Sequence, residues 1–256
     1  MVELLTAIAA GGLVGFTLGL VGGGGSILAT PLLLYAVGIA QPHVAIGTGA
    51  VAVSVNAYAN LIGHARKGHV QWRCAILFAL VGVIGALAGS TLGKLVDGQR
   101  LLFLFGLLML VVGALMLRPR RDSAAAPRPV DLRMCLLTGA AALMAGGASG
   151  FFGIGGGFLI VPALVFATGM RTIDAVGSSL LAVGTFGLAT ALNYAASGLV
   201  DWLVAAEFIG GGVMGGALGT VLAARLSHRK NVLNRIFAAL IFVVAAYVLY
   251  RSGLAG

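Results

Sequence analysis

Two stretches of the chain repeat one another. Residues 19–38 read GLVGGGGSILATPLLLYAVG, and residues 150–169 read GFFGIGGGFLIVPALVFATG. With an offset of 131 residues, the stretches match at these pairs: Gly19 and Gly150, Gly22 and Gly153, Gly24 and Gly155, Gly25 and Gly156, Leu28 and Leu159, Pro31 and Pro162, and Gly38 and Gly169. A repeat with a fixed offset indicates a duplicated structural unit.

The repeat continues downstream with an offset of 130, because the connection after Gly38 is one residue longer than the one after Gly169. Further matches include Ala45 and Ala175, Gly47 and Gly177, Trp72 and Trp202, and Gly82 and Gly212. The only charged and proline-containing stretch separates the two copies. We therefore predict three parts: a first transmembrane repeat over 1–118, a cytoplasmic linker over 119–132, and a second transmembrane repeat over 133–256.

The composition excludes an ordinary soluble domain. The chain of 256 residues is 60% hydrophobic and 9% charged, whereas soluble domains have about 25% charged residues. Its 41 glycines lie largely inside apolar runs, where membrane helices use small residues to approach closely. The net charge of +9 is then loop charge and not a nucleic-acid-binding face. Cys74 and Cys135 are too few for a disulfide framework or a metal site, and nothing indicates a cofactor.

The apolar runs predict an all-α polytopic membrane protein. Most of them reach the roughly 20 residues that a membrane span needs. The runs cover 4–20, 26–38, 43–63, 73–95 and 100–117, and then 133–152, 157–168, 173–196, 201–224 and 232–250. The second run of each copy is too short to cross and directly follows a glycine cluster, as a half-helix would. We expect about 8–10 helices, including short broken or re-entrant ones.

The basic residues of the loops predict the orientation in the membrane. If the first two runs of each copy form a hairpin, the loops with most of the basic residues all lie on one side, which is then cytoplasmic. These loops carry Arg66, Lys67 and Arg73, the linker arginines, and Arg225, Arg229, Lys230 and Arg235. Both termini would be extracytoplasmic. Each copy then has an odd number of crossings, so the two copies form inverted-topology repeats.

The two glycine clusters are the candidate substrate site. In transporters with inverted repeats, paired glycine-interrupted segments point to the binding site. A glycine-rich turn aims several backbone N–H groups into one space, and the helix that follows adds its positive end, so an anion is held without a buried cation. The candidates are Gly22, Gly23, Gly24, Gly25, Ser26, Gly153, Gly155, Gly156 and Gly157. Close helix packing is the alternative role, which we assign to the GxxxG pairs such as Gly15 with Gly19.

The duplicated pattern G-x-x-G-x-G-G-x-x-L-x-x-P, followed by Ala-x-Gly-Thr at Ala45 or Ala-x-Gly-Ser at Ala175, resembles the TauE/SafE sulfite exporter family, also called TSUP transporters. The resemblance covers essentially the whole chain. It implies a secondary carrier of a sulfur-containing anion such as sulfite, a sulfonate, sulfoacetate or thiosulfate. Ser26 and Gly23 depart from their counterparts Gly157 and Ile154. The two half-sites need not be equivalent.

Polar residues of the third run in each copy extend the candidate site. Asn56, Asn60 and His64 form one stripe on a helix, and Thr190, Asn193 and Ser197 form its counterpart. Such a stripe either lines a hydrated path or bonds to a neighbouring helix. Three hydroxyl residues near the start of the same runs either donate to the anion or cap helices: Thr48, Ser178 and Ser179.

Glu207 is the one acid well inside an apolar run, and intramembrane acids are candidates for function. Glu207 and His64 are therefore candidates for proton coupling. The alternatives for Glu207 are solvation near the interface and a pairing with His64, which lies beside Arg66 at a run end. The expected partners are the lipid bilayer, a small sulfur oxyanion and a coupling proton or ion.

The predicted function is alternating-access transport of this anion across the cell inner membrane. A passive anion channel is the alternative, since no sequence feature separates the two. A membrane-embedded enzyme is a weaker one, because the four histidines all lie at loops or run ends: His43, His64, His69 and His228.

Overall fold

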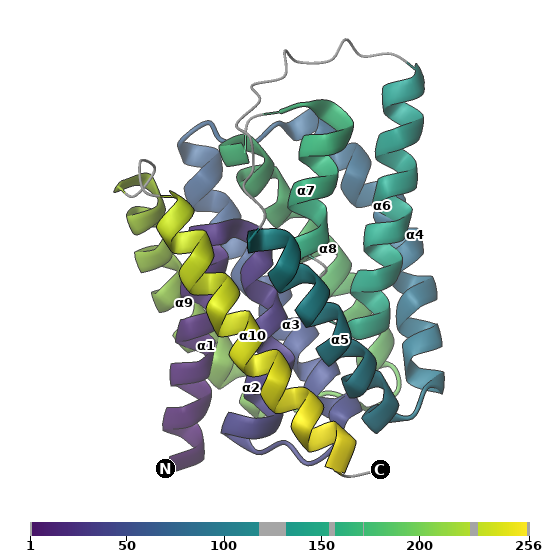
Figure 1. The fold of residues 1–256 in the computed structure, drawn as a ribbon, viewed down its shortest axis with the longest axis vertical. Coiled ribbons are helices and arrows are strands. Elements are labelled where there is room, and N and C mark those ends of the chain that lie inside the picture. The colour runs from purple at the N-terminus through teal and green to yellow at the C-terminus, as the bar shows by residue number, and fades with distance from the viewer. Residues whose placement is uncertain (1, 118–131, 154–156, 171, 226–229, 255–256) are drawn as a thin grey trace.

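The chain folds into a bundle of helices in the computed structural model (Figure 1). The structure describes residues 2–117, 132–153, 157–170, 172–225 and 230–254, and these ranges contain helices and no strands. The first half contains α1 (Val2–Val21), η1 (Gly22–Leu28), α2 (Ala29–Leu32), η2 (Leu33–Val37), α3 (Pro42–Arg66), α4 (Trp72–Leu95) and α5 (Gly98–Leu117). The second half contains α6 (Leu132–Phe152), α7 (Gly157–Thr168), α8 (Thr172–Ala195), α9 (Trp202–Arg225) and α10 (Lys230–Leu254). The predicted all-α fold is confirmed.

Five helical segments of the described ranges are long and apolar enough to cross a membrane. They are Leu4–Val37, Pro42–Arg66, Trp72–Leu95, Ile173–Ala195 and Trp202–Ala223. Large apolar side chains point outward from these helices, as Leu80 and Ile84 do with 66% of their surface exposed. A soluble protein does not present long apolar faces to water, whereas a bilayer accepts them. The protein is therefore a multi-pass membrane protein.

The helices pack in pairs that match across the two halves. α1 packs on α9, and α6 packs on α4 in the same way. A side chain on Gly15 would overlap the backbone of Gly212, and one on Gly146 would overlap the backbone of Gly82. The predicted packing role of such glycines is thus found in both halves. α3 packs against α8 at the centre, and α5 packs against α10.

Equivalent helices of the two halves run in opposite directions. In Figure 1, α1 rises from the N-terminus at the lower end, whereas α6 starts at the upper end and descends. Likewise α5 ends at the upper side, whereas α10 ends beside the C-terminus at the lower side. Both ends of the chain therefore lie at the same end of the bundle.

The first short segment is helical throughout, although its geometry changes along its length. η1 is a 3₁₀-helix, α2 is one α-helical turn, and η2 is a π-helix. Gly22 has φ +75° and Gly153 has φ +67°, a conformation that favours glycine, so the chain turns sharply after α1 and after α6. From the sequence, Gly22–Gly25 are predicted to form a glycine-rich turn before a half-helix. They instead form the tighter 3₁₀-helix of η1.

Candidate functional site

The two glycine-rich breaks touch each other inside the bundle. A side chain on Gly157, at the start of α7, would overlap the backbone of Gly23 in η1, and a side chain on Gly23 would in turn overlap Gly157. Both glycines are buried. Segments more than 130 residues apart in the sequence therefore meet backbone to backbone, which only glycine permits at this separation.

Two serines hold the first break in place. The Gly23 N–H donates to Ser179 Oγ of α8 over 3.4 Å, and Ser179 Oγ donates to the Val176 carbonyl over 2.8 Å. The hydroxyl of Ser26 donates to the Gly23 carbonyl over 2.8 Å. Gly23 thus has both its N–H and its carbonyl paired with a serine. Ser26 and Ser179 are fully buried, so these two predicted residues lie with the glycines they were predicted to assist.

Each break packs against the central helix of the other half. A side chain on Gly22 would lie 2.8 Å from Val176 of α8, and a side chain on Gly153 would overlap Ile46 of α3. Val176 and Ile46 are themselves 130 residues apart, so these contacts match. Gly24 and Gly25 are buried, and Gly25 packs on Thr17 of α1. The other predicted members of the second cluster, Gly155 and Gly156, lie outside the described residues.

Thr48 and Ser178 each cap a helix of the opposite half. Thr48 Oγ1 accepts from the Asp201 N–H over 2.9 Å, and Ser178 Oγ accepts from the Gln71 N–H over 2.9 Å. Asp201 and Gln71 directly precede α9 and α4, whose first N–H groups have no partner within their own helix. Both hydroxyls thus pair with the N–H of a residue that directly precedes a helix of the opposite half, and their contact with an anion stays a prediction.

The stripe of Asn56, Asn60 and His64 faces α1 and α9. Asn56 packs against Gly212, and Asn60 accepts from the Thr220 hydroxyl over 3.0 Å. His64 Nε2 lies 3.3 Å from the carbonyl oxygen of Gly19. All three side chains are buried; His64 lies in the last turn of α3, at the run end as predicted, with its ring inside the bundle. Asn60 and His64 bond to neighbouring helices, one of the two roles predicted for the stripe, whereas the Asn56 amide has no hydrogen-bond partner among the described residues.

Asn193 lies in a polar cluster at the end of α4. Its Nδ2 donates to Ser90 Oγ over 2.6 Å and to Thr91 Oγ1 over 3.0 Å. The ammonium of Lys94 donates to Asn193 Oδ1 over 2.7 Å and to Ser197 Oγ over 2.9 Å. Asn193 therefore joins α8 to α4 and is not brought to the glycine breaks.

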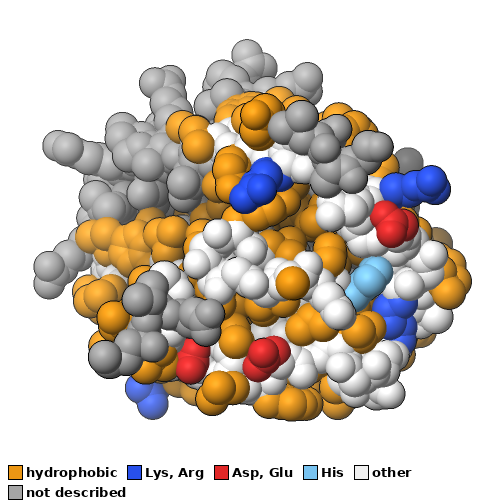
Figure 2. Space-filling model, turned by 90° about the horizontal axis from the view of Figure 1, so that it is seen from below, with side chains coloured by type: hydrophobic (Ala, Val, Ile, Leu, Met, Phe, Trp, Pro, Cys, Tyr) orange, Lys and Arg blue, Asp and Glu red, His pale blue; other side chains and the backbone are white. Residues whose placement is uncertain are grey.

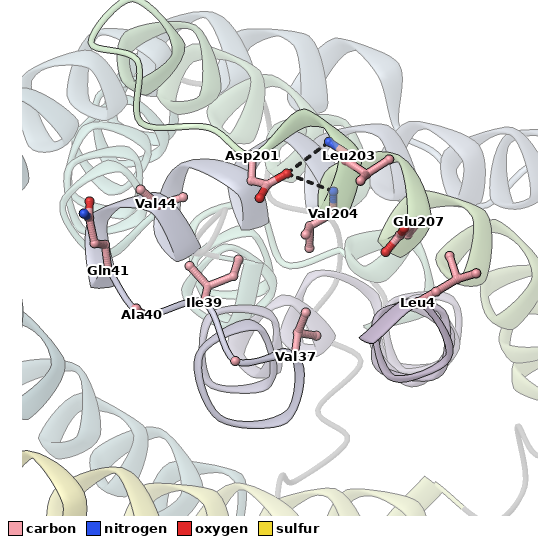
Figure 3. Close-up of a pocket in the computed structure, with 11 residues that line it drawn as sticks. Leu4, Val37, Ile39, Ala40, Gln41, Val44, Asp201, Leu203, Val204 and Glu207 are labelled. Atoms are coloured by element: carbon pink, nitrogen blue, oxygen red, sulfur yellow. Dashed lines mark hydrogen bonds between the residues drawn. The ribbon is translucent and has the colours of Figure 1, made fainter. Parts of the chain in front are cut away.

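Glu207 lines a cavity of about 520 Å³ that is separate from the breaks. Figure 3 shows Asp201, directly before α9, and Glu207 of α9 facing the segment that joins η2 to α3, where Ile39 and Gln41 lie. Asp201 Oδ1 accepts from the N–H groups of Leu203 and Val204, each over 3.1 Å. The cavity includes Leu4, so it belongs to the end of the bundle where the chain begins.

Acidic and basic side chains are scattered over that end of the bundle among apolar and uncharged ones, and they do not form one basic surface (Figure 2). Glu207 is half-buried at the cavity and does not pair with His64, which bonds to Gly19 near the opposite end of α3.

No three His, Cys, Asp or Glu side chains gather closely enough to hold a metal ion in the part of the chain that the structure describes.

Comparison with known proteins decides the family. The family model described as "Sulfite exporter TauE/SafE" matches residues 7–248. The chain belongs to the TauE/SafE family. A "Probable membrane transporter protein" of Xylella fastidiosa (strain 9a5c) is 66% identical to this TauE/SafE chain over 251 residues, which cover 98% of the chain and 96% of the relative. The "Probable membrane transporter protein YunE" of Bacillus subtilis (strain 168) is 24% identical and covers 94% of the chain, with 96% of the relative covered. No solved structure gives a significant match.

This TauE/SafE protein is accordingly a multi-pass membrane transporter, as the family and the apolar helices agree.

The structure also shows two cations that the sequence analysis passed over as site residues. Besides Lys94, the ammonium of Lys67 donates to the carbonyl of Thr220 over 3.1 Å. Lys67 joins α3 to α9, and Lys94 joins α4 to α8, which are matching interfaces. The offset of 130 residues pairs Lys67 with Ser197 and Lys94 with Ala224, so the repeat pattern gives no signal for these two lysines.

Proposed function

We propose that this TauE/SafE protein is a secondary transporter that moves a small sulfur-containing anion across the inner membrane by alternating access. The substrate class is sulfite, a sulfonate, sulfoacetate or thiosulfate. The observation that supports the proposal most is the meeting of the two glycine breaks at Gly23 and Gly157. Broken helices that meet inside a bundle are the usual place of a substrate site in transporters with internal repeats.

The chemistry of the breaks suits an anion. Residues 22–37 form a continuous helical segment whose first N–H groups lie in the buried glycine cluster, and α7 starts at Gly157 beside it. The N–H groups at helix starts carry partial positive charge, and they attract anions without the desolvation cost of a buried lysine or arginine. The Gly23 N–H donates to Ser179 Oγ, so an anion at this break would be bound by the neighbouring N–H groups or by displacing that serine. We assign substrate binding to Gly22–Ser26, to 153–157 and to Ser179. Asn56, Asn60, Thr48, Ser178 and Asn193 then support the surrounding helices.

The matched contacts support two inverted repeats over 1–118 and 133–256, joined by a cytoplasmic linker. α1 with α9 and α6 with α4 form equivalent pairs, and equivalent helices run in opposite directions. In this orientation the α3–α4 loop with Lys67 is cytoplasmic and both termini are extracytoplasmic. Rocking of one repeat against the other would expose the glycine breaks to each side in turn.

Uptake by liposomes that contain the purified protein tests the proposal. Liposomes loaded with unlabelled sulfite, thiosulfate, sulfoacetate or sulfate are diluted into the same labelled anion, and uptake is compared with protein-free liposomes. A carrier exchanges label against the internal anion, because its site faces one side at a time. We expect exchange of at least one of the sulfite, thiosulfate and sulfoacetate samples. No exchange of any of them would refute the proposal.

The same liposomes separate the carrier from a passive anion channel. In a carrier, anion loaded on the inside accelerates the uptake of label far above that of empty liposomes. In a channel, label enters at a rate set by its own gradient and the membrane potential, and the internal anion gives no such acceleration. Equal rates with and without internal anion would favour the channel.

A further inference from the structure

The faces that α3 and α8 present to their neighbours differ in chemistry, although their positions match. With the offset of 130 residues, three buried residues of α3 correspond to three buried residues of α8. The pairs are Asn56 and Phe186, Asn60 and Thr190, and His64 and Tyr194. All six side chains are at most 3% exposed. One stripe therefore ends in an imidazole, and the other ends in a phenol.

Their surroundings match as well. Asn56 packs against Gly212 of α9, and Phe186 packs against Gly82 of α4, which is the residue equivalent to Gly212. Phe186 also stacks on Phe78 with ring centroids 6.1 Å apart. The α1–α3–α9 interface is thus polar where the α6–α8–α4 interface is aromatic. Only the first of these matched stripes holds a side chain that exchanges a proton near neutral pH.

His64 connects this polar stripe to the first glycine break. Its Nε2 lies 3.3 Å from the Gly19 carbonyl oxygen, in the last turn of α1 and three residues before Gly22. A carbonyl only accepts, so Nε2 carries the hydrogen and Nδ1 keeps its lone pair. In the described part of the chain, Nδ1 is buried without a hydrogen-bond partner. In this arrangement the imidazole is neutral and has one vacant proton-accepting atom.

The groups around His64 oppose a proton on Nδ1 in this arrangement. Lys67 follows it by three residues, directly after the end of α3, and the His69 ring centroid lies 6.2 Å from the His64 ring centroid. α1 presents the Gly19 backbone to it, and α8 presents Gly177 and carries the acid Asp174 one turn earlier. From α9, the Thr220 carbonyl already accepts from Lys67. A protonated His64 would lie beside a lysine and have no acceptor for Nδ1, so it requires α1 to move away from α3 and admit water.

We propose that His64 is the proton-binding group that couples proton movement to anion movement at the glycine breaks, an inference that rests on the proposed transport function. The Nδ1 lone pair accepts a proton from water on the side to which α1 and α3 open. The imidazolium releases it to water when the Gly19 contact re-forms. Because Gly19 precedes the break by less than one turn, this contact transmits the protonation state of His64 to the substrate site. Tyr194 at the matching position has no such role.

Accumulation driven by a pH gradient tests His64 separately from transport itself. Liposomes with the full-length protein receive labelled sulfite, or the anion of the four-anion test that exchanges best. Exchange is measured without a pH gradient. Net accumulation is measured in two gradients: one with pH 6 outside and pH 7.5 inside, and one with pH 7.5 outside and pH 6 inside. The variants are His64→Gln, which keeps a donor for the Gly19 carbonyl, and Tyr194→Phe as the matched control.

We expect wild type and Tyr194→Phe to accumulate the anion severalfold in one gradient direction. His64→Gln should exchange the anion within about twofold of wild type and show no gradient-driven accumulation. Gradient-driven accumulation by His64→Gln would overturn the proposal. So would a wild type that exchanges the anion but accumulates none of it in either pH gradient. Loss of exchange in a correctly inserted His64→Gln protein would also overturn it, because His64 would then serve the structure. Absence of exchange in wild type would instead refute the proposed function.

Discussion

The α1–α9 and α6–α4 interfaces share their backbone packing, but the side chains next to them differ. Gly15 meets Gly212 in the first, and Gly146 meets Gly82 in the second, through contacts that exclude any side chain. Next to these contacts the first interface has the amide of Asn56, and the second has the ring of Phe186. The glycines are therefore a requirement of the fold in both halves, whereas the neighbouring residues were free to diverge.

This difference distinguishes residues that the fold requires in both halves, such as the crossing glycines, from residues that differ between the halves, such as Asn56 and Phe186. Where two helices cross with their backbones in contact, only glycine fits at the crossing point, so glycine is needed at these positions in both halves. A buried amide costs free energy unless it is hydrogen-bonded, so its presence in one half alone needs a reason other than packing. We infer that function resides where the two halves differ and at the breaks where they meet.

The largest effect should come from the breaks. We expect Gly24→Val and Gly155→Val each to lower anion exchange at least about 100-fold, because a branched side chain occupies the space of the anion and restricts the turn. Flux into liposomes measures this effect. Membrane insertion should persist, as seen by size-exclusion chromatography of the purified variants. If only one of the two substitutions abolished exchange, the breaks would not form one shared site.

A matched control for these substitutions lies on α9. Gly210 is exposed, and a side chain there would meet nothing within 4 Å among the described residues. Gly210→Val should therefore retain exchange close to that of wild type. A loss as large as that of Gly24→Val would show that helix glycines in general, and not those of the breaks, are needed.

The crossing glycines should give the next largest effect, equal in the two halves. Gly15→Ala and Gly146→Ala each place a methyl group on the backbone of the partner helix, which should cost about 1–3 kcal/mol. In a chain of this size that corresponds to a fall in Tm of roughly 5 °C. Thermal unfolding in detergent measures it. Gly139→Ala, where the described residues leave open space, should not lower Tm. A large effect in one half only would break the structural match.

Much of this fold could be predicted because bilayer helices are long and uniformly apolar. The run 73–95 became Trp72–Leu95, and the run 157–168 became Gly157–Thr168. The glycine breaks were found because duplication places them at one fixed offset. The 3₁₀ and π geometry around Ala29–Leu32 could not be predicted, since it depends on how that segment packs against α1, α3 and α7.

The roles of individual polar residues were harder to predict. Thr48 and Ser178 lie near the starts of their apolar runs in the sequence, which suggested capping or ligand contact, but each binds an N–H of the other half. The partners lie more than 100 residues away, so no local pattern identifies them. Asn193 shows the same limit, because its partners Ser90, Thr91 and Lys94 all belong to α4.

These crossed caps should give a smaller effect that is again equal in both halves. Thr48→Ala and Ser178→Ala each leave one N–H before a helix without its acceptor, at a cost of about 1 kcal/mol. The fall in Tm should be roughly 3 °C for each variant. The double variant should show about the sum, because the two sites have no shared partner. A strongly non-additive result would mean that the α9 and α4 starts respond as one unit.

The smallest effect, and the one that tests the difference between the halves, concerns Asn56. Neither amide atom of Asn56 has a hydrogen-bond partner among the described residues, whereas Asn60 bonds to Thr220 and to the Asn56 carbonyl. Asn56→Leu should therefore leave the free energy of unfolding unchanged or raise it by up to about 1 kcal/mol, seen as an equal or higher Tm, because the apolar residue Phe186 already fills the matching position. Asn60→Leu should lower it by a similar amount, because the Thr220 hydroxyl loses its acceptor.

Thermal unfolding of the two leucine variants in one detergent makes the comparison direct. If Asn56→Leu is more stable than wild type, the Asn56 amide lowers the stability of the natural protein, and we infer that the polar interface serves transport. If Asn56→Leu is clearly destabilised, the amide is satisfied in the folded protein by a bound water or ion. The contrast between the two interfaces would then be one of hydration, because the first would owe part of its stability to a molecule that the aromatic second interface excludes.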